Sequence, residues 1–205
     1  MTVITERICP RLHPVLQGAV VAEDGLTVEF EGRTVRGESL RECAGELANL
    51  LYEHVHSGVQ SEAAPRPKRL RDPETEAALA AEVPHQTTLC PARTVRRQGD
   101  HVLVEIDGVR VLVPASAMGP SDGVLALPAA RPALSPGFFL VDGSRGRPAP
   151  GPLLRVYMHI AEPQYITGVW SSALTLLEGC GVPYRAKVIS SPQLLPRRDS
   201  FVVYL

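Results

Sequence analysis

Two short apolar segments near the C-terminal end carry side chains that could bind an anion and move a proton. Residues 153–160 and 182–189 each alternate apolar and polar side chains, as half-buried β-strands do. The polar positions are Arg155, Tyr157 and His159 in the first segment and Arg185 and Lys187 in the second. If both segments lie in one sheet, these side chains share a face, because successive side chains of a strand point to opposite faces. Guanidinium groups bind phosphate through paired N–H donors, so the pattern predicts an anion site.

An ordinary surface is the alternative explanation. Each Arg or Tyr, taken alone, is at least as well explained as a surface residue with a buried stem on a half-solvated sheet. The convergence of all these groups on one face is what favours a site. Arg197 and Arg198, from the next loop, are expected to be able to join it.

The segment between the two strands is expected to be a helix. Pro163 opens a stretch whose apolar side chains recur at helical spacing through Leu177, and Gly179 and Gly181 close it. This order predicts a C-terminal βαβ unit with both strands parallel in one sheet and the helix over one face. A last apolar strand is expected over Phe201–Leu205.

Earlier segments predict smaller elements. Alternation over 26–35 around Glu31-Gly32 predicts a hairpin, and Ser39 with Glu42 forms a capping-box pattern before a helix over about 39–56. Asp72-Pro73 is expected to begin a helix that runs through Glu82. Between these two helices, 57–71 is expected to be a flexible basic loop.

The strongest strand signal lies at 101–116. Aliphatic residues alternate on both sides of Asp107-Gly108, which predicts a type I′ turn pairing Ile106 with Val109. All of them are expected on one core face: Val102, Val104, Ile106, Val109, Val111 and Val113. The following stretch, 114–152, is expected to be mostly Pro/Gly-rich loop, with a short strand at Phe138–Val141. The predicted fold class is α+β: a mixed β-sheet with helices packed on one side.

Composition limits the function classes. The 205 residues suit one domain, and 21 basic against 22 acidic residues give a net charge of −1, which argues against nucleic-acid or anionic-membrane binding. No stretch is long and apolar enough to span a membrane, and no export signal is visible. The 4 cysteines are dispersed, so neither a zinc site nor a disulfide framework is expected. A cytoplasmic protein without a metal or cofactor is predicted.

Several short motifs carry a family resemblance. They are Arg155-x-Tyr157, Gly181-Val182-Pro183-Tyr184-x-x-Lys187 and Arg198-Asp199-x-x-Val202-x-Tyr204, together with Leu51-Tyr52, His56-Ser57-Gly58 and Pro136-Gly137-Phe138-Phe139. Residues 136–205 in particular resemble the HopA-type effector family. Its members occur as type III effectors of plant pathogens and in biosynthesis of ribosomally made peptides such as thioamitides and class V lanthipeptides. The chain is therefore expected to form a single HopA-like domain over 1–205.

The resemblance implies a phosphopeptide lyase. A kinase-like phosphotransferase would phosphorylate Ser or Thr in a precursor peptide, and this protein would eliminate phosphate to leave a dehydroamino acid. Such a β-elimination needs a base for the α-proton and cations for the phosphate. Lys187 is the candidate base, Tyr157 or His159 the candidate acid, and Arg155, Arg198 and Arg185 the candidate phosphate ligands, with Asp199 expected to orient Arg198.

The alternative is a noncatalytic protein that binds a peptide or a partner enzyme. Similar proteins continue beyond the strand that ends at Tyr204, so a truncated, inactive member is also consistent with the sequence. In that case the expected binding surfaces are loop 57–71 and an exposed edge of the final strand.

Overall fold

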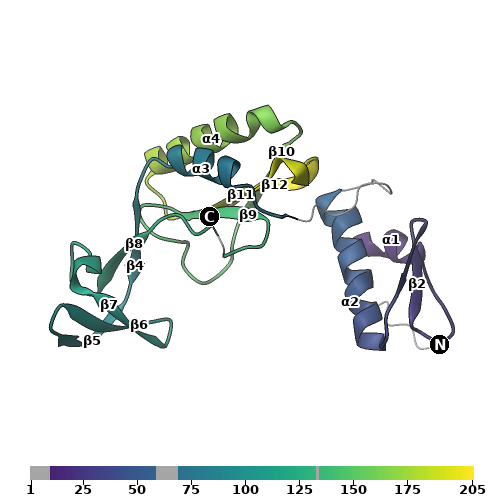
Figure 1. Ribbon diagram of the computed structural model, residues 1–205, viewed down its shortest axis with the longest axis horizontal. Coiled ribbons are helices and arrows are strands. Elements are labelled where there is room, and N and C mark those ends of the chain that lie inside the picture. The colour runs from purple at the N-terminus through teal and green to yellow at the C-terminus, as the bar shows by residue number, and fades with distance from the viewer. Residues whose placement is uncertain (1–9, 59–68, 133) are drawn as a thin grey trace. The chain divides into compact units, whose positions relative to one another are not determined.

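A computed structural model describes residues 10–58, 69–132 and 134–205. The chain divides into two compact units, Met1–Arg66 and Pro67–Leu205, and each is described by itself (Figure 1). The expected α+β class is confirmed, since helices and antiparallel sheets occur in both units. The expectation of one HopA-like domain over 1–205 stays a prediction.

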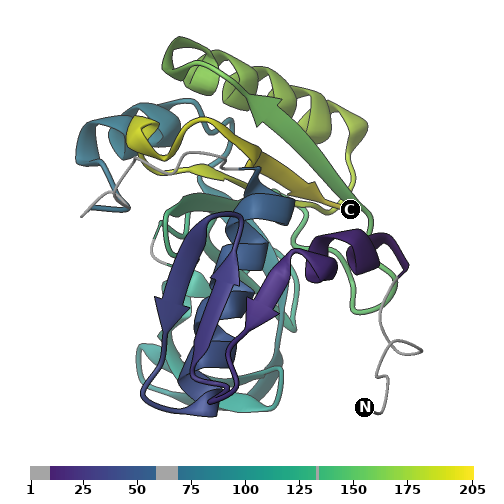
Figure 2. The same cartoon turned by 90° about the vertical axis from the view of Figure 1, so that its right-hand side faces the viewer.

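Unit 1 is a small antiparallel sheet with a helix against it (Figure 2). Its elements are η2 (Pro10–Leu12), α1 (His13–Gln17), β1 (Ala19–Val21), β2 (Thr27–Phe30), β3 (Arg33–Arg36), α2 (Leu40–Leu51) and the π-helix η3 (Tyr52–Ser57). The predicted hairpin is confirmed, and its turn residues Glu31 and Gly32 have φ angles of 50° and 74°. The predicted helix is also confirmed, because Ser39 Oγ accepts the N–H of Glu42 at 3.3 Å and caps α2.

The expected basic loop 57–71 lies mostly outside the described residues. Ser57 ends η3, Gly58 caps it in the left-handed conformation, and residues 59–68 are not described.

Unit 2 contains the remaining elements. They are α3 (Pro73–Ala81), β4 (Thr87–Pro91), β5 (Arg93–Gln98), β6 (His101–Ile106), β7 (Val109–Pro114), η4 (Ala115–Ala117), β8 (Val124–Pro128), β9 (Phe138–Asp142), β10 (Arg155–Ile160), η5 (Pro163–Tyr165), α4 (Ile166–Cys180), β11 (Arg185–Ile189), η6 (Pro192–Leu194) and β12 (Arg197–Tyr204). The predicted helices at 73 and 163 and the short strand at 138 are confirmed.

The C-terminal sheet has the strand order β10-β12-β11-β9, with every neighbouring pair antiparallel. Strands β10 and β11 both run antiparallel to β12, so they are parallel to each other, as expected, but β12 lies between them. The expected exposed edge on the final strand is therefore wrong. Strand β12 is paired on both of its sides, with β10 and with β11, and chain order alone does not reveal this.

Helices α3 and α4 cover one face of this sheet (Figure 1). Trp170 of α4 is fully buried, and its ring packs edge-on against Phe201 with centroids 5.4 Å apart. Its indole Nε1–H donates to the carbonyl oxygen of Leu79 in α3 at 3.1 Å, which fixes one helix to the other. The other face of the sheet carries polar side chains together with the buried Phe138, Leu140 and Val202.

The hairpin module, which we define as β4–β8, precedes the C-terminal sheet. The predicted turn is confirmed, since Ile106 pairs with Val109 and Asp107 and Gly108 have φ angles of 49° and 80°. The expected core face is only partly correct, because Val109 is 61% exposed and Val111 39% exposed. The module's small core, Val102, Val104, Val113 and Leu125, covers the end of the hairpin away from the turn. Strands β4, β5 and β8 were not predicted.

No helix among the described residues is long and apolar enough to cross a membrane.

Candidate functional site

The face of the C-terminal sheet away from α3 and α4 brings together polar residues from β10, β11 and β12. In one cross-strand row, Tyr204 lies opposite Arg155 on one side and Arg185 on the other. In the next row, Val202 lies between Tyr157 and Lys187. The sequence prediction that Arg155, Tyr157, Arg185 and Lys187 share a face is therefore confirmed by the register.

Lys187 is partly buried on this face. Its Nζ lies 4.1 Å from the centroid of the Phe138 ring. Burial lowers the pKa of Lys187 below its ordinary value of 10.5; the charge of Asp199 opposes this shift, and those of Arg197 and Arg155 add to it. No carboxylate of the described residues forms an ion pair with the amine. A lysine in this environment loses its proton more readily than one in water.

Arg155 lies beside Tyr204. Its guanidinium carbon is 5.9 Å from the centroid of the Tyr204 ring, and the Arg155 side chain is exposed. Burial raises the pKa of Tyr204, against the charge of Arg155. Arg155 forms no ion pair with a carboxylate in the described part of the chain. Its donors are therefore open to an anion that reaches the face.

Arg185 is held by a buried carboxylate. Its Nε and Nη2 donate to Asp142, directly opposite in β9, at 2.6 and 3.0 Å. Arg131 approaches the same carboxylate at 3.2 Å, and Asp142 is 3% exposed. Arg185 is therefore fixed in place with part of its charge compensated, and its assignment as a phosphate ligand stays a prediction.

His159 and Tyr157 lie on the edge strand β10. Nδ1 of His159 is 2.9 Å from the carbonyl oxygen of Arg197, so this nitrogen carries the proton that it donates. The register of β10 and β12 shifts between Met158 and Ile160, which places His159 at an irregularity of the strand. Tyr157 is 46% exposed and follows the regular register. Neither assignment as a proton donor is tested by these positions.

Arg197 and Arg198 begin β12 and do not lie in a loop. Arg197 donates to Asp199 at 2.5 and 2.8 Å, and its guanidinium carbon lies 5.1 Å from the centroid of the Phe138 ring. Asp199, expected to orient Arg198, is thus paired with Arg197, while the Arg198 side chain is exposed. The role of Arg198 stays a prediction.

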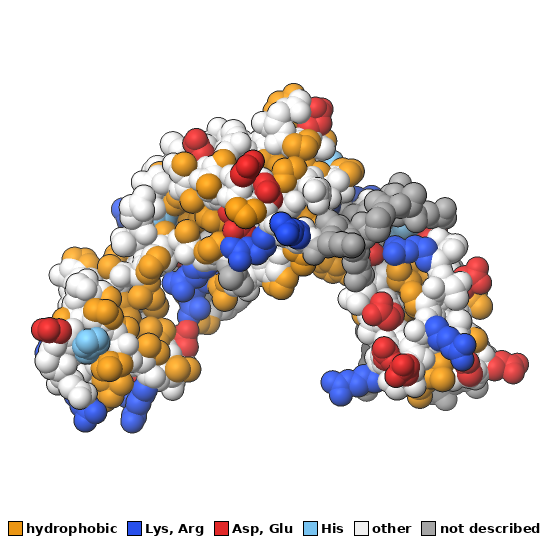
Figure 3. All heavy atoms as spheres, viewed as in Figure 1, with side chains coloured by type: hydrophobic (Ala, Val, Ile, Leu, Met, Phe, Trp, Pro, Cys, Tyr) orange, Lys and Arg blue, Asp and Glu red, His pale blue; other side chains and the backbone are white. Residues whose placement is uncertain are grey.

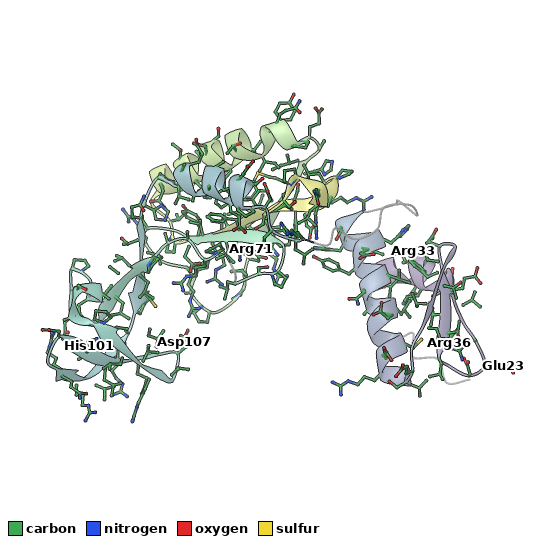
Figure 4. All side chains as sticks on the ribbon, viewed as in Figure 1. Glu23, Arg33, Arg36, Arg71, His101 and Asp107 are labelled. Atoms are coloured by element: carbon green, nitrogen blue, oxygen red, sulfur yellow. The ribbon has the colours of Figure 1, made fainter. Side chains whose placement is uncertain are left out.

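A pocket of about 310 Å³ opens at this face, and we call it the Lys187 hollow. Its lining residues are Ser135, Leu140, Arg147, Pro148, Leu153, Arg185, Lys187 and Tyr204. Arg147 was not among the predicted site residues. It comes from the connection between β9 and β10 and forms an ion pair with Asp107 in the β6–β7 turn, whose hydrogen bond raises the pKa of Arg147 (Figure 4, where Asp107 is labelled). Partners 40 residues apart leave no local sequence signal.

Among the described residues, no group of His, Cys, Asp and Glu could hold a metal ion. The Lys187 hollow itself supplies a lysine whose pKa is lowered, arginine donors for an anion, and a tyrosine hydroxyl.

Comparison with known proteins bears on the same part of the chain. No curated protein matches the sequence. The model of the HopA1 effector protein family matches residues 129–205, which include all of β9, β10, α4, β11 and β12. The expected resemblance is confirmed over these residues, so the stretch that forms the C-terminal sheet and its helix α4 is the part of the chain that is similar to the HopA1 effector protein family.

Proposed function

We propose that this protein is a phosphopeptide lyase. Its substrate is a ribosomally made precursor peptide that a kinase-like partner has phosphorylated on Ser or Thr, and its product is the dehydroamino acid. The observation that carries the proposal is the position of Lys187: partly buried, with a lowered pKa, on the face that it shares with Arg155. The family match over 129–205 supports it.

The reaction requires one proton transfer and one bond cleavage. The neutral amine of Lys187 removes the α-proton of the phosphorylated residue. The electron pair forms the Cα–Cβ double bond, the Cβ–O bond breaks, and inorganic phosphate leaves. A base acts best when its pKa lies near the working pH, and burial shifts Lys187 in that direction.

The phosphate needs cations that are not already compensated. Arg155 meets this requirement among the described residues, and Arg147 and Arg185 line the hollow while they are held by Asp107 and Asp142. Guanidinium donors stabilise the charge that develops on the leaving oxygen. Tyr157, His159 and Arg198 remain our candidates for the acid and for a further phosphate ligand.

Peptide binding without turnover is the second candidate. Strand β10 is an edge of the C-terminal sheet, and its Val156 and Tyr157 are 38% and 46% exposed. An edge strand can pair with an extended peptide. The edge of β12, which was the expected binding surface, is not available because β12 is paired with β10 and with β11.

Mass spectrometry separates the two functions. The protein is incubated with a set of synthetic phosphoserine and phosphothreonine peptides, and loss of phosphoric acid is measured together with binding. A lyase converts at least part of the set. Peptides that bind and keep their phosphate would overturn the lyase proposal and support binding alone.

A further inference from the structure

A second hollow adjoins the Lys187 hollow. Its volume is about 400 Å³, and Arg147 and Arg185 line both. In Figure 3, Lys and Arg side chains gather with apolar ones where the hairpin module joins the C-terminal sheet. A ligand whose phosphate lies near Lys187 can therefore extend past these two guanidinium groups into the second hollow.

The charged groups of the second hollow are already paired with one another. Asp142 accepts from Arg185 and lies within ion-pair distance of Arg131, and Asp107 pairs with Arg147. The rest of the lining is mostly apolar. We call its large aliphatic side chains, Leu89, Ile106, Leu127 and Leu134, the apolar wall. Because both carboxylates of the hollow are already paired, a basic ligand group would find no free partner in its lining, and the apolar wall favours an apolar side chain as the occupant.

The spacing of the two hollows suits an extended peptide. Lys187 and Leu140 lie opposite each other and line the Lys187 hollow, and Asp142, two positions along β9 from Leu140, lines the second hollow. Two strand residues span about 7 Å. Every second side chain of an extended peptide points to the same side at this spacing. A peptide residue two positions from the one at Lys187 therefore reaches the second hollow.

We propose that the second hollow binds a large aliphatic side chain two residues from the phosphorylated residue of the substrate peptide. This inference rests on the proposed function. Most of the apolar wall comes from Leu89, Ile106 and Leu127, which precede the family match at residue 129. The hairpin module thus determines sequence preference, and the matched part of the chain carries the reacting groups.

Binding and turnover are measured separately to test it. The peptides are alanine-rich and contain α-methylphosphoserine, which has no α-proton and cannot undergo elimination, with one Leu at −2, −1, +1 or +2. We expect Leu at −2 or at +2 to strengthen binding about tenfold over Ala, the lower end of what one methylene contributes in an apolar pocket. Equal binding of all peptides, or a preference for −1 or +1 alone, would overturn the proposal.

A matched pair of variants ties the preference to this hollow. Leu134 lines it and is 58% exposed, and Leu176 lies on α4 and is 68% exposed. Leu134→Ser lowers the Leu-to-Ala binding ratio from about tenfold to below about threefold, and Leu176→Ser leaves the ratio unchanged. A ratio that Leu134→Ser does not change also overturns the proposal, provided that both variants keep the wild-type circular dichroism spectrum and thermal midpoint.

The two proposals fail differently. A leucine preference in binding without elimination of the corresponding phosphoserine peptides leaves the second hollow assigned and removes the lyase. Elimination at a rate that does not depend on the residue at −2 or +2 would keep the lyase and remove the assignment of the second hollow.

Discussion

The amine of Lys187 and the guanidinium of Arg197 lie over the same aromatic ring, that of Phe138, at 4.1 and 5.1 Å from its centroid. Cation–π attraction holds such groups in place without supplying a counter-charge. Asp199 compensates Arg197 directly, while Lys187 has no ion-pair partner among the described carboxylates. Phe138 can therefore position the amine while favouring its charged form less than a carboxylate would.

Removal of Arg155 should raise the pKa of Lys187. The charge of Arg155 lowers this pKa, so Arg155→Met moves it back toward 10.5. Carbon-13 NMR of labelled lysine measures it directly, because the chain has only two lysines, Lys68 and Lys187, and Lys187→Met assigns the signals. Arg97→Met, at an exposed position of β5, is the control and should cause no shift. An unchanged or lower pKa in Arg155→Met would contradict the electrostatic account.

Asp142 is expected to stabilise unit 2 strongly. Asp142→Ala leaves Arg131 and Arg185 without their shared carboxylate, and breaking a largely buried ion pair of this kind costs about 2–4 kcal/mol. Urea denaturation followed by circular dichroism measures the loss. The exposed Asp122→Ala should change the free energy of unfolding by less than about 0.5 kcal/mol. Equal stabilities of the two variants would show that the pair contributes nothing.

Glu178 is expected to make the free energy of unfolding depend on pH in the acidic range. Burial alone would raise its pKa, but hydrogen bonds from the hydroxyl and N–H of Ser144 lower it below the ordinary value of 4.5. A lowered folded-state pKa stabilises the protein above pH 4.5, and this contribution is lost as the pH falls through the folded value. Urea denaturation from about pH 6 to pH 3 should therefore show a smaller loss of stability in Glu178→Gln than in the wild type. Parallel curves would refute the assignment.

Local signals predicted the elements that depend on local interactions. Ser39 and Asp72 are side-chain caps that act within three residues, and the Asp107-Gly108 turn needs only two residues with positive φ. Alternation along 153–160 and 182–189 correctly placed Arg155 and Lys187 on one face. These features are set by period and capping, which a sequence displays directly.

Long-range pairing could not be predicted in the same way. The insertion of β12 between β10 and β11 depends on hydrogen bonds between distant segments. Strand β4 likewise pairs with β8, although β5, β6 and β7 lie between them in the chain. The place of Arg147 in the site could not be predicted for the same reason, because its ion-pair partner Asp107 lies in the distant β6–β7 turn. Val109 and Val111 alternate as core residues do, yet the module has too little apolar surface to cover them.

The base assigned to the reaction can be tested by one rate. Elimination from a phosphoserine peptide that the wild type converts is measured by mass spectrometry with Lys187→Met, and binding of the α-methylphosphoserine peptide is measured on the same preparation. Because a positioned base contributes roughly 100-fold or more to such a step, the rate should fall by at least that factor, with binding changed by less than about fivefold. A variant that binds the peptide and eliminates phosphate at the wild-type rate would contradict the assignment of Lys187 as the base.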